Sequence, residues 1–153
     1  MNQLGTSRTP WHLWVVGIVS LLWHCVGAMD YVLTKLENRA YIASMTEPMG
    51  VDADTAIVYF TAFPLWMNIA WALGVWGTFA GSVLLLMRSR YAFHSFAVAL
   101  IGLALASYYQ LISNPFPGLT DNTIPMIFTA AIIVITIALT WYSRRQIAAG
   151  VLR

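Results

Sequence analysis

Charged side chains are scarce in this sequence. Only 9% of the 153 residues are Asp, Glu, Lys or Arg, and 59% are hydrophobic. A soluble domain carries about 25% charged residues, so this composition excludes an ordinary soluble fold, a disordered chain and a nucleic-acid-binding protein. An integral membrane protein remains, in which residues 1–153 form a single membrane domain.

The sequence has a single cysteine and none of the usual catalytic sets. The only cysteine, Cys25, cannot form an intramolecular disulfide, which excludes a disulfide scaffold. The sequence has no set of paired carboxylates, no nucleophile with a base at helical spacing, no bis-histidine pair and no phosphate-binding loop. We therefore expect no enzyme activity, no cofactor and no metal site.

Four stretches lack any Asp, Glu, Lys or Arg. They cover residues 9–29, 55–87, 91–120 and 122–143. A helix needs roughly 20 apolar residues to cross a hydrocarbon core about 30 Å thick, and the stretches show no alternation typical of a membrane barrel. We predict an all-α, integral membrane four-helix bundle with helices over about 11–33, 64–87, 91–112 and 123–142.

The charges are distributed unevenly between the two sides of the predicted bundle. Six of the eight cations lie on the side of the termini: Arg8, Arg88, Arg90, Arg144, Arg145 and Arg153. Lys35 and Arg39 lie on the opposite side, together with all six acids. This bias places both termini in the cytoplasm and the protein in a bacterial inner membrane.

The long segment of residues 34–63 is predicted to form a mostly helical extracytoplasmic cap. Leu33, Leu36, Ala40 and Ala43 recur at helical spacing, which favours an outward continuation of the first helix. Asp52 or Asp54 is suited to cap a short helix. Pro64 predicts a kink or a fresh helix start where the chain enters the membrane.

Several polar and aromatic residues are expected near the outer ends of the helices. Helical counting from Trp11 puts His24 about 20 Å into the membrane. An ionisable group at that depth suggests function, although a structural histidine is the alternative. The predicted ligand-binding cup consists of His24, Asp30, Asn68, Trp71, Tyr108 and Gln110. An interfacial belt of aromatic residues is the alternative to a cup.

The second predicted helix carries Gly74, Gly77 and Gly81 on one side. Glycines at this spacing let two membrane helices approach closely. We predict a helix-packing interface, either inside the bundle or with a second copy or another membrane protein.

Several short motifs carry a resemblance to a known family. They are WHLWVVG at 11–17, SLLW at 20–23, GAMDY at 27–31, FPLW at 63–66, WALGVWG at 71–77 and GVLR at 150–153. With these, the chain resembles an uncharacterised family of short proteobacterial inner-membrane proteins, some of which are labelled "sugar transporter". The resemblance implies four helices in the inner membrane. It implies no site residues, and His24 stands where that family is expected to have asparagine.

The leading hypothesis is a non-enzymatic accessory or partner-binding subunit of a membrane complex. Its expected partners are the lipid bilayer and another membrane protein or a second copy of the chain. The alternatives are a small-solute carrier that acts as an oligomer, with sugar-like molecules among its candidate solutes, and a lipid- or quinone-binding protein. The carrier would use the cup for a small organic ligand, whereas a lipid or quinone would bind between the second and third predicted helices.

Overall fold

The computed structural model describes residues 9–119 and 121–153, so Arg8 of the orientation argument lies outside the described residues. Within this part the chain forms six α-helices and no strand. The four long helices are α1 (Trp11–Lys35), α4 (Leu65–Leu86), α5 (Tyr91–Tyr108) and α6 (Thr123–Ala148). A π-helical turn, Tyr109–Ser113, continues α5. Each of the four is long and apolar enough to cross a membrane, as the charge-free stretches predict.

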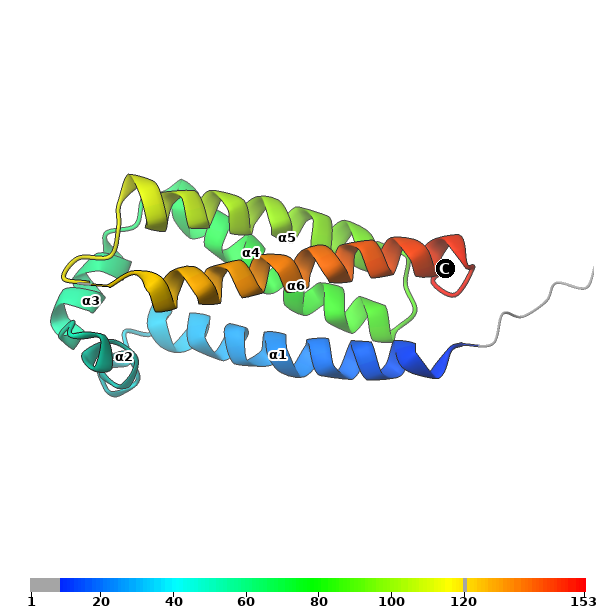
Figure 1. Ribbon diagram of the computed structural model, residues 1–153, viewed down its shortest axis with the longest axis horizontal. Helices are drawn as coiled ribbons and strands as arrows, with labels where there is room; N and C mark the ends of the chain where they lie inside the picture. Colours follow the sequence, from blue (N-terminus) through cyan, green and yellow to red (C-terminus); the bar gives the residue numbers. More distant parts are fainter. Residues whose placement is uncertain (1–8, 120) are drawn as a thin grey trace, which may run out of the picture.

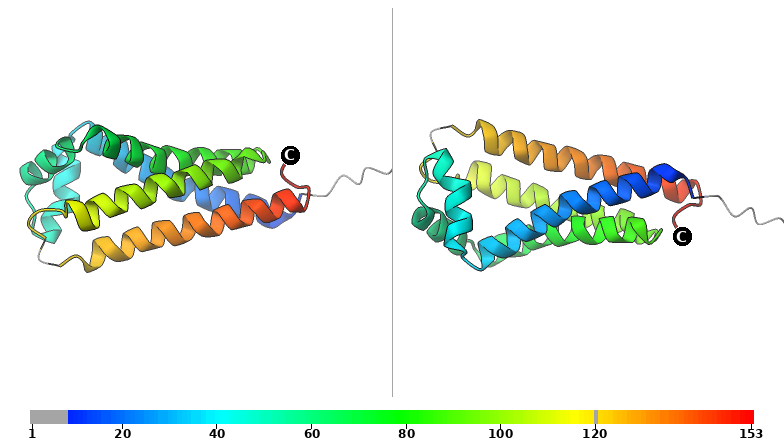
Figure 2. Two further views of the ribbon diagram at one scale, coloured as in Figure 1. Left: turned by 90° about the horizontal axis from the view of Figure 1, so that it is seen from above. Right: turned by 90° about the horizontal axis from the view of Figure 1, so that it is seen from below.

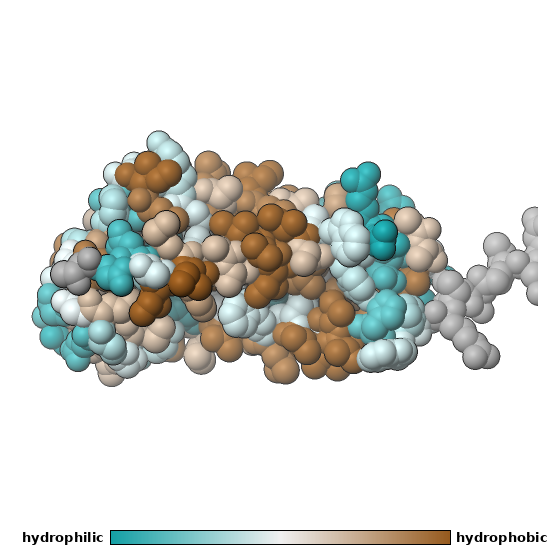
Figure 3. Space-filling model, in the orientation of Figure 1, coloured by the Kyte–Doolittle hydropathy of each residue, from teal (hydrophilic) through white to brown (hydrophobic). Residues whose placement is uncertain are grey.

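The four long helices run side by side along the molecule (Figure 1). α4 packs between α1 and α5, and α5 packs against α6. Ring contacts between Trp23 and Phe128 and between His12 and Tyr142 connect α1 with α6. On the face shown in Figure 3, hydrophobic residues gather in the middle and hydrophilic residues toward both ends.

The α2–α3 segment (residues 36–63) lies at the end opposite the carboxyl terminus (Figures 1 and 2). It contains α2 (Arg39–Thr46), a 3-10 turn (Glu47–Met49) and α3 (Ala53–Thr61). Asn38 caps α2 by accepting a hydrogen bond from the Tyr41 N–H, and Asp52 caps α3 by accepting one from the Thr55 N–H. Of the two carboxylates suited to start α3, Asp52 is the one that does so.

The first helix does not continue outward as its apolar spacing suggests. α1 ends at Lys35, and Glu37 has a positive φ of 52° that breaks the helix. The Asn38 side chain then starts α2 in a new direction, because a capping side chain satisfies amides that the helix would leave unpaired. Pro64 marks a fresh start, since α4 begins at the following residue.

The last helix is longer than predicted and ends in a folded-back tail. α6 continues six residues past the predicted boundary at 142. Gly150, at φ 68°, reverses the chain, and the amides of Val151 and Leu152 donate to the Gln146 carbonyl. The tail then pairs with the α4–α5 turn, where the amide of Arg153 donates to Arg88 O and the amide of Arg90 donates to Arg153 O, both at 2.9 Å.

Glycines set the distance between α4 and α5. A Cβ at Gly102 would lie 2.5 Å from Ala70 O and 2.7 Å from Gly74 N. These are main-chain atoms, so the clash cannot be relieved by turning a side chain. Gly27 on α1 has open space, because a Cβ added there would have no atom within 4 Å.

We expect Gly102→Ala to lower the free energy of unfolding by about 1–3 kcal/mol, because overpacking forces the two backbones apart. The matched change Gly27→Ala adds the same methyl group into open space and should be neutral or slightly stabilising. Unfolding in mixed micelles followed by circular dichroism compares the two. Equal effects of the two substitutions would contradict the proposed role of the close approach.

Candidate functional site

Five of the six residues of the predicted cup lie at the end of the long helices next to the α2–α3 segment. Asp30 is near the end of α1, Asn68 and Trp71 are in the first turns of α4, and Tyr108 and Gln110 are at the end of α5. His24 is the sixth and lies elsewhere.

Asn68 and Trp71 both contact Lys35, a residue that the sequence analysis did not include in the cup. The Lys35 ammonium donates a hydrogen bond to Asn68 Oδ1 and lies 5.1 Å from the centre of the Trp71 ring. The Asn68 amide group in turn donates to the Phe63 carbonyl at 2.9 Å. The ring of Tyr31, one turn before Lys35, contacts Trp71 edge-on at 4.9 Å. The spacing of Tyr31 and Lys35, four apart on α1, is the signal that places both on this face.

Asp30 is held by the α2–α3 segment. The Tyr41 hydroxyl donates to the Asp30 carboxylate at 2.8 Å. Burial, together with the negative charge of Asp30, raises the pKa of Tyr41 to about 12, because ionisation would place a phenolate beside a carboxylate. An exposed ion pair of Arg39 with Asp54 ties α2 to α3. Asp30 therefore fixes α2 against α1.

Tyr109, rather than Tyr108, faces the aromatic interior at the end of α5. Its ring lies 5.5 Å from Phe63 and 5.3 Å from Trp66. Tyr108 is 56% exposed. Gln110 is half-buried within the π-helical turn. The sequence places Tyr108 and Tyr109 at the same depth, so the depth argument that selects the cup does not tell which of the two tyrosines points inward.

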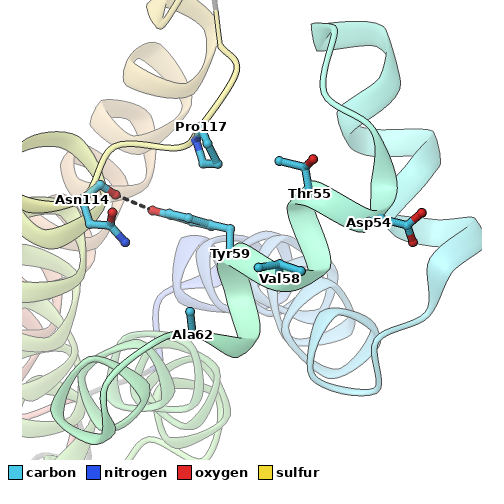
Figure 4. A pocket seen from close by; sticks show the side chains of 7 residues that line it. All are labelled: Asp54, Thr55, Val58, Tyr59, Ala62, Asn114 and Pro117. Atoms are coloured by element: carbon cyan, nitrogen blue, oxygen red, sulfur yellow. Dashed lines mark hydrogen bonds between the residues drawn. The ribbon is translucent and has the colours of Figure 1, made fainter.

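A small pocket lies on the other side of α3 (Figure 4). It has a volume of about 500 Å³ and is lined by Asp54, Thr55, Val58, Tyr59, Ala62, Asn114 and Pro117. The Tyr59 hydroxyl donates to the Asn114 carbonyl at 2.8 Å across its floor, and burial raises the pKa of Tyr59 to about 12. None of the six predicted cup residues lines this pocket.

His24 is buried between helices and contacts none of the other cup residues. Its Nδ1 lies 2.8 Å from Ser82 Oγ, and its ring is 6.3 Å from Phe96. Ser82 lies four residues before the end of α4 and Phe96 five residues after the start of α5. His24 lies in the middle of α1, six residues and about 9 Å of helical rise before Asp30. Its side chain contacts Ser82 and Phe96 rather than another residue of the predicted cup.

The hydrogen bonds around Ser82 define the proton on His24. Ser82 donates its hydroxyl proton to the Thr78 carbonyl at 3.1 Å, so its oxygen accepts a hydrogen bond from His24 Nδ1–H. Nε2 then carries the lone pair of a neutral imidazole. Nε2 is buried without a hydrogen-bond partner among the described residues.

The three glycines of α4 pack inside the chain. Positions for a Cβ at Gly74, Gly77 and Gly81 would lie 3.1 Å from Leu103, 2.9 Å from Ala99 and 2.7 Å from Phe96, all on α5. Of the two interfaces left open by the sequence, these glycines form the one within the chain.

The described residues contain no group of three His, Cys, Asp or Glu side chains arranged to hold a metal ion. No family model, no curated protein and no solved structure matches the chain.

We expect Ser82→Ala and His24→Leu to be coupled in a double-mutant cycle of unfolding free energies. Interhelical hydrogen bonds in membrane proteins contribute about 0.6–1.7 kcal/mol in such cycles. The control pairs His24→Leu with Thr140→Val, whose hydroxyl bonds to Thr136 O on α6, and should give a coupling near zero. A His24–Ser82 coupling no larger than this control would exclude the interhelical bond.

Proposed function

We propose that this chain is a non-enzymatic integral inner-membrane protein that acts as an accessory or partner-binding subunit. The supporting observation is the exposure of the first half of α6. The first buried residue of α6 is Thr136, so the preceding thirteen residues place no side chain fully in the core, although the most apolar stretch of α6 has a higher mean hydropathy than the corresponding stretch of any other long helix. This half is the part of the bundle that we expect a partner helix to cover.

The adjoining face of α1 offers room for close contact. Trp23 of α1 meets Phe128 of α6 at 6.0 Å. One turn further along α1, Gly27 is exposed and has open space around it. Small residues let the backbones of two membrane helices approach, which strengthens their association. Gly27 beside the exposed half of α6 therefore suits a second transmembrane helix better than a polar ligand.

The polar side chains within the long helices support a role without catalysis. Ser20, Thr78, Ser95, Thr136 and Thr140 each donate a hydrogen bond to a main-chain carbonyl. Hydroxyls bonded in this way are typical of structural positions in membrane helices. The described residues thus use most of their polar groups inside the spans for packing.

The same proposal includes the orientation of the chain in the membrane and its membership of a family. Five arginines lie at the end of the molecule that contains the α4–α5 turn, and the acids lie at the other end. These arginines are Arg88, Arg90, Arg144, Arg145 and Arg153. The excess of arginine supports a cytoplasmic location for both termini and an extracytoplasmic cap formed by the α2–α3 segment. Membership of the uncharacterised proteobacterial family remains part of the proposal through the sequence motifs that the chain shares with it.

We predict that a cysteine at Ser44 is labelled by a membrane-impermeant maleimide in intact spheroplasts, whereas one at Ser89 is labelled only after lysis. Cys25→Ala provides the background, and lysed cells confirm that both sites react. Labelling of both positions in intact spheroplasts would contradict the orientation.

We predict that a photoreactive amino acid at Ile127 of α6 cross-links to a membrane protein of defined mass. Ile69 is the matched control, because it occupies a similar depth on α4. The side chain of Ile127 is 65% exposed and that of Ile69 is 52% exposed. Two differently tagged copies of the chain show whether the partner is a second copy. Identical cross-linking patterns from both positions would count against a partner on α6.

A second candidate, a small-solute carrier acting as an oligomer, is favoured by the Lys35–Asn68–Trp71 contact. An ammonium held over an indole ring beside a carboxamide suits a ligand with hydroxyl or acidic groups. The two candidates differ in their use of Asn68: a carrier loses vesicle uptake when Asn68 is replaced by alanine, whereas partner cross-linking through Ile127 is unaffected.

A further inference from the structure

A second pocket lies at the α4–α5 turn, at the end of the molecule that carries the arginines. It has a volume of about 350 Å³ and is lined by Leu84, Met87, Arg88, Ser89 and Arg153. The lining therefore joins two guanidinium groups and a hydroxyl to apolar surface. Met87 is 70% exposed, so an apolar side chain lies open beside the two arginines.

Arg88 occupies a backbone position that normally favours glycine. Its φ is 58°, and it follows directly on the last turn of α4. Helices commonly end with glycine in this left-handed conformation, because a side chain there is strained. Strain of this kind, where it persists, points to a use for the side chain.

The surroundings of Arg88 fix its main chain and leave most of its side chain available. The main chain is held by the pairing with Arg153, and Nε donates to the Val151 carbonyl at 3.4 Å. The two terminal amino groups of the guanidinium make no hydrogen bond to the described residues. They remain free to donate to a ligand.

The positive charges of this pocket have no acidic side chain to neutralise them. Within residues 9–119 and 121–153 the one ion pair is Arg39 with Asp54, at the opposite end of the molecule. Arg90 and Arg145 lie over the rings of Tyr91 and Trp141. The pocket therefore places two arginines, unpaired with any Asp or Glu side chain of the described residues, where the apolar surface of the helices ends.

We propose that this pocket binds the phosphate of an anionic phospholipid between Arg88 and Arg153, with an acyl chain along Leu84 and Met87. Guanidinium groups match the geometry of phosphate oxygens through paired hydrogen bonds. Basic pockets at the cytoplasmic ends of membrane helices suit anionic headgroups. The exposed apolar side of the pocket distinguishes an amphiphilic ligand from free phosphate. Lipid binding of this kind extends the proposed function and rests only on the location of the α4–α5 turn at a membrane surface.

The decisive variant is Arg88→Gly in the full-length purified chain. Glycine adopts positive φ without strain, so this variant should unfold, in detergent without added lipid, at a temperature no lower than that of the original chain. Its affinity for phosphatidylglycerol, measured by native mass spectrometry, should fall about fivefold. Arg153→Gln should weaken the same lipid similarly, and phosphatidylcholine should bind weakly to all variants.

Arg144→Gln is the matched control, because it removes one charge from the same end but outside the pocket. It should change the affinity for phosphatidylglycerol less than twofold. A loss of affinity as large as that of Arg88→Gly would overturn the proposed binding site, because the lipid would then be attracted by the overall positive charge of this end. Inorganic phosphate that binds as tightly as the lipid would overturn the lipid assignment. Cross-linking through Ile127 should be unchanged in the Arg88→Gly variant, since partner binding does not depend on the pocket. A failure of the lipid proposal can therefore be told apart from a failure of the proposed function.

Discussion

The close approach of α4 and α5 is the contact on which the other elements depend. Gly102 brings its Cα against main-chain atoms of Ala70 and Gly74, and the Ser95 hydroxyl donates to the Gly77 carbonyl across the same interface at 2.7 Å. Because hydrocarbon offers no hydrophobic drive between helices, van der Waals packing of this kind supplies much of their association. The hairpin places Phe96 beside His24 and presents the α4–α5 turn to the carboxyl-terminal tail.

Much of the helical architecture could be predicted from where charge is missing. A charged residue is costly inside a bilayer, so gaps between charges mark the spans nearly to the residue, as at Tyr91 and Thr123. The end of α6 could not be predicted this way. Arg144 and Arg145 lie past the predicted end of the span, but nothing in their chemistry stops a helix, which runs on until Gly150 reverses the chain.

Predicting the candidate site is harder, because it depends on how helices are staggered and rotated. Asn68 and Trp71 lie close together since both follow Pro64 by one to two turns, a relation visible in the sequence. The charge pattern places Lys35 beyond the end of the first predicted helix, and its contact with them requires knowing that α1 extends to Lys35 and which face of α1 packs on α4. Helical counting gives the depth of His24 along α1, but it does not show that the side chain contacts Ser82 on α4. Charged side chains at the two ends of the molecule also differ in their partners. Asp30 accepts a hydrogen bond and Asp54 forms an ion pair within the chain, whereas Arg88 and Arg153 pair with no Asp or Glu side chain among the described residues.

The uneven packing of α6 has a consequence for how the protein is made. The three helices α1, α4 and α5 share the glycine contacts and the His24–Ser82 bond, and none of these contacts requires the first half of α6. Chains are synthesised from the amino terminus at about 5–20 residues per second, so α1, α4 and α5 are complete before α6 has been made. The contacts among these three helices can therefore form without α6, whose second half is then held to the α4–α5 turn by the tail.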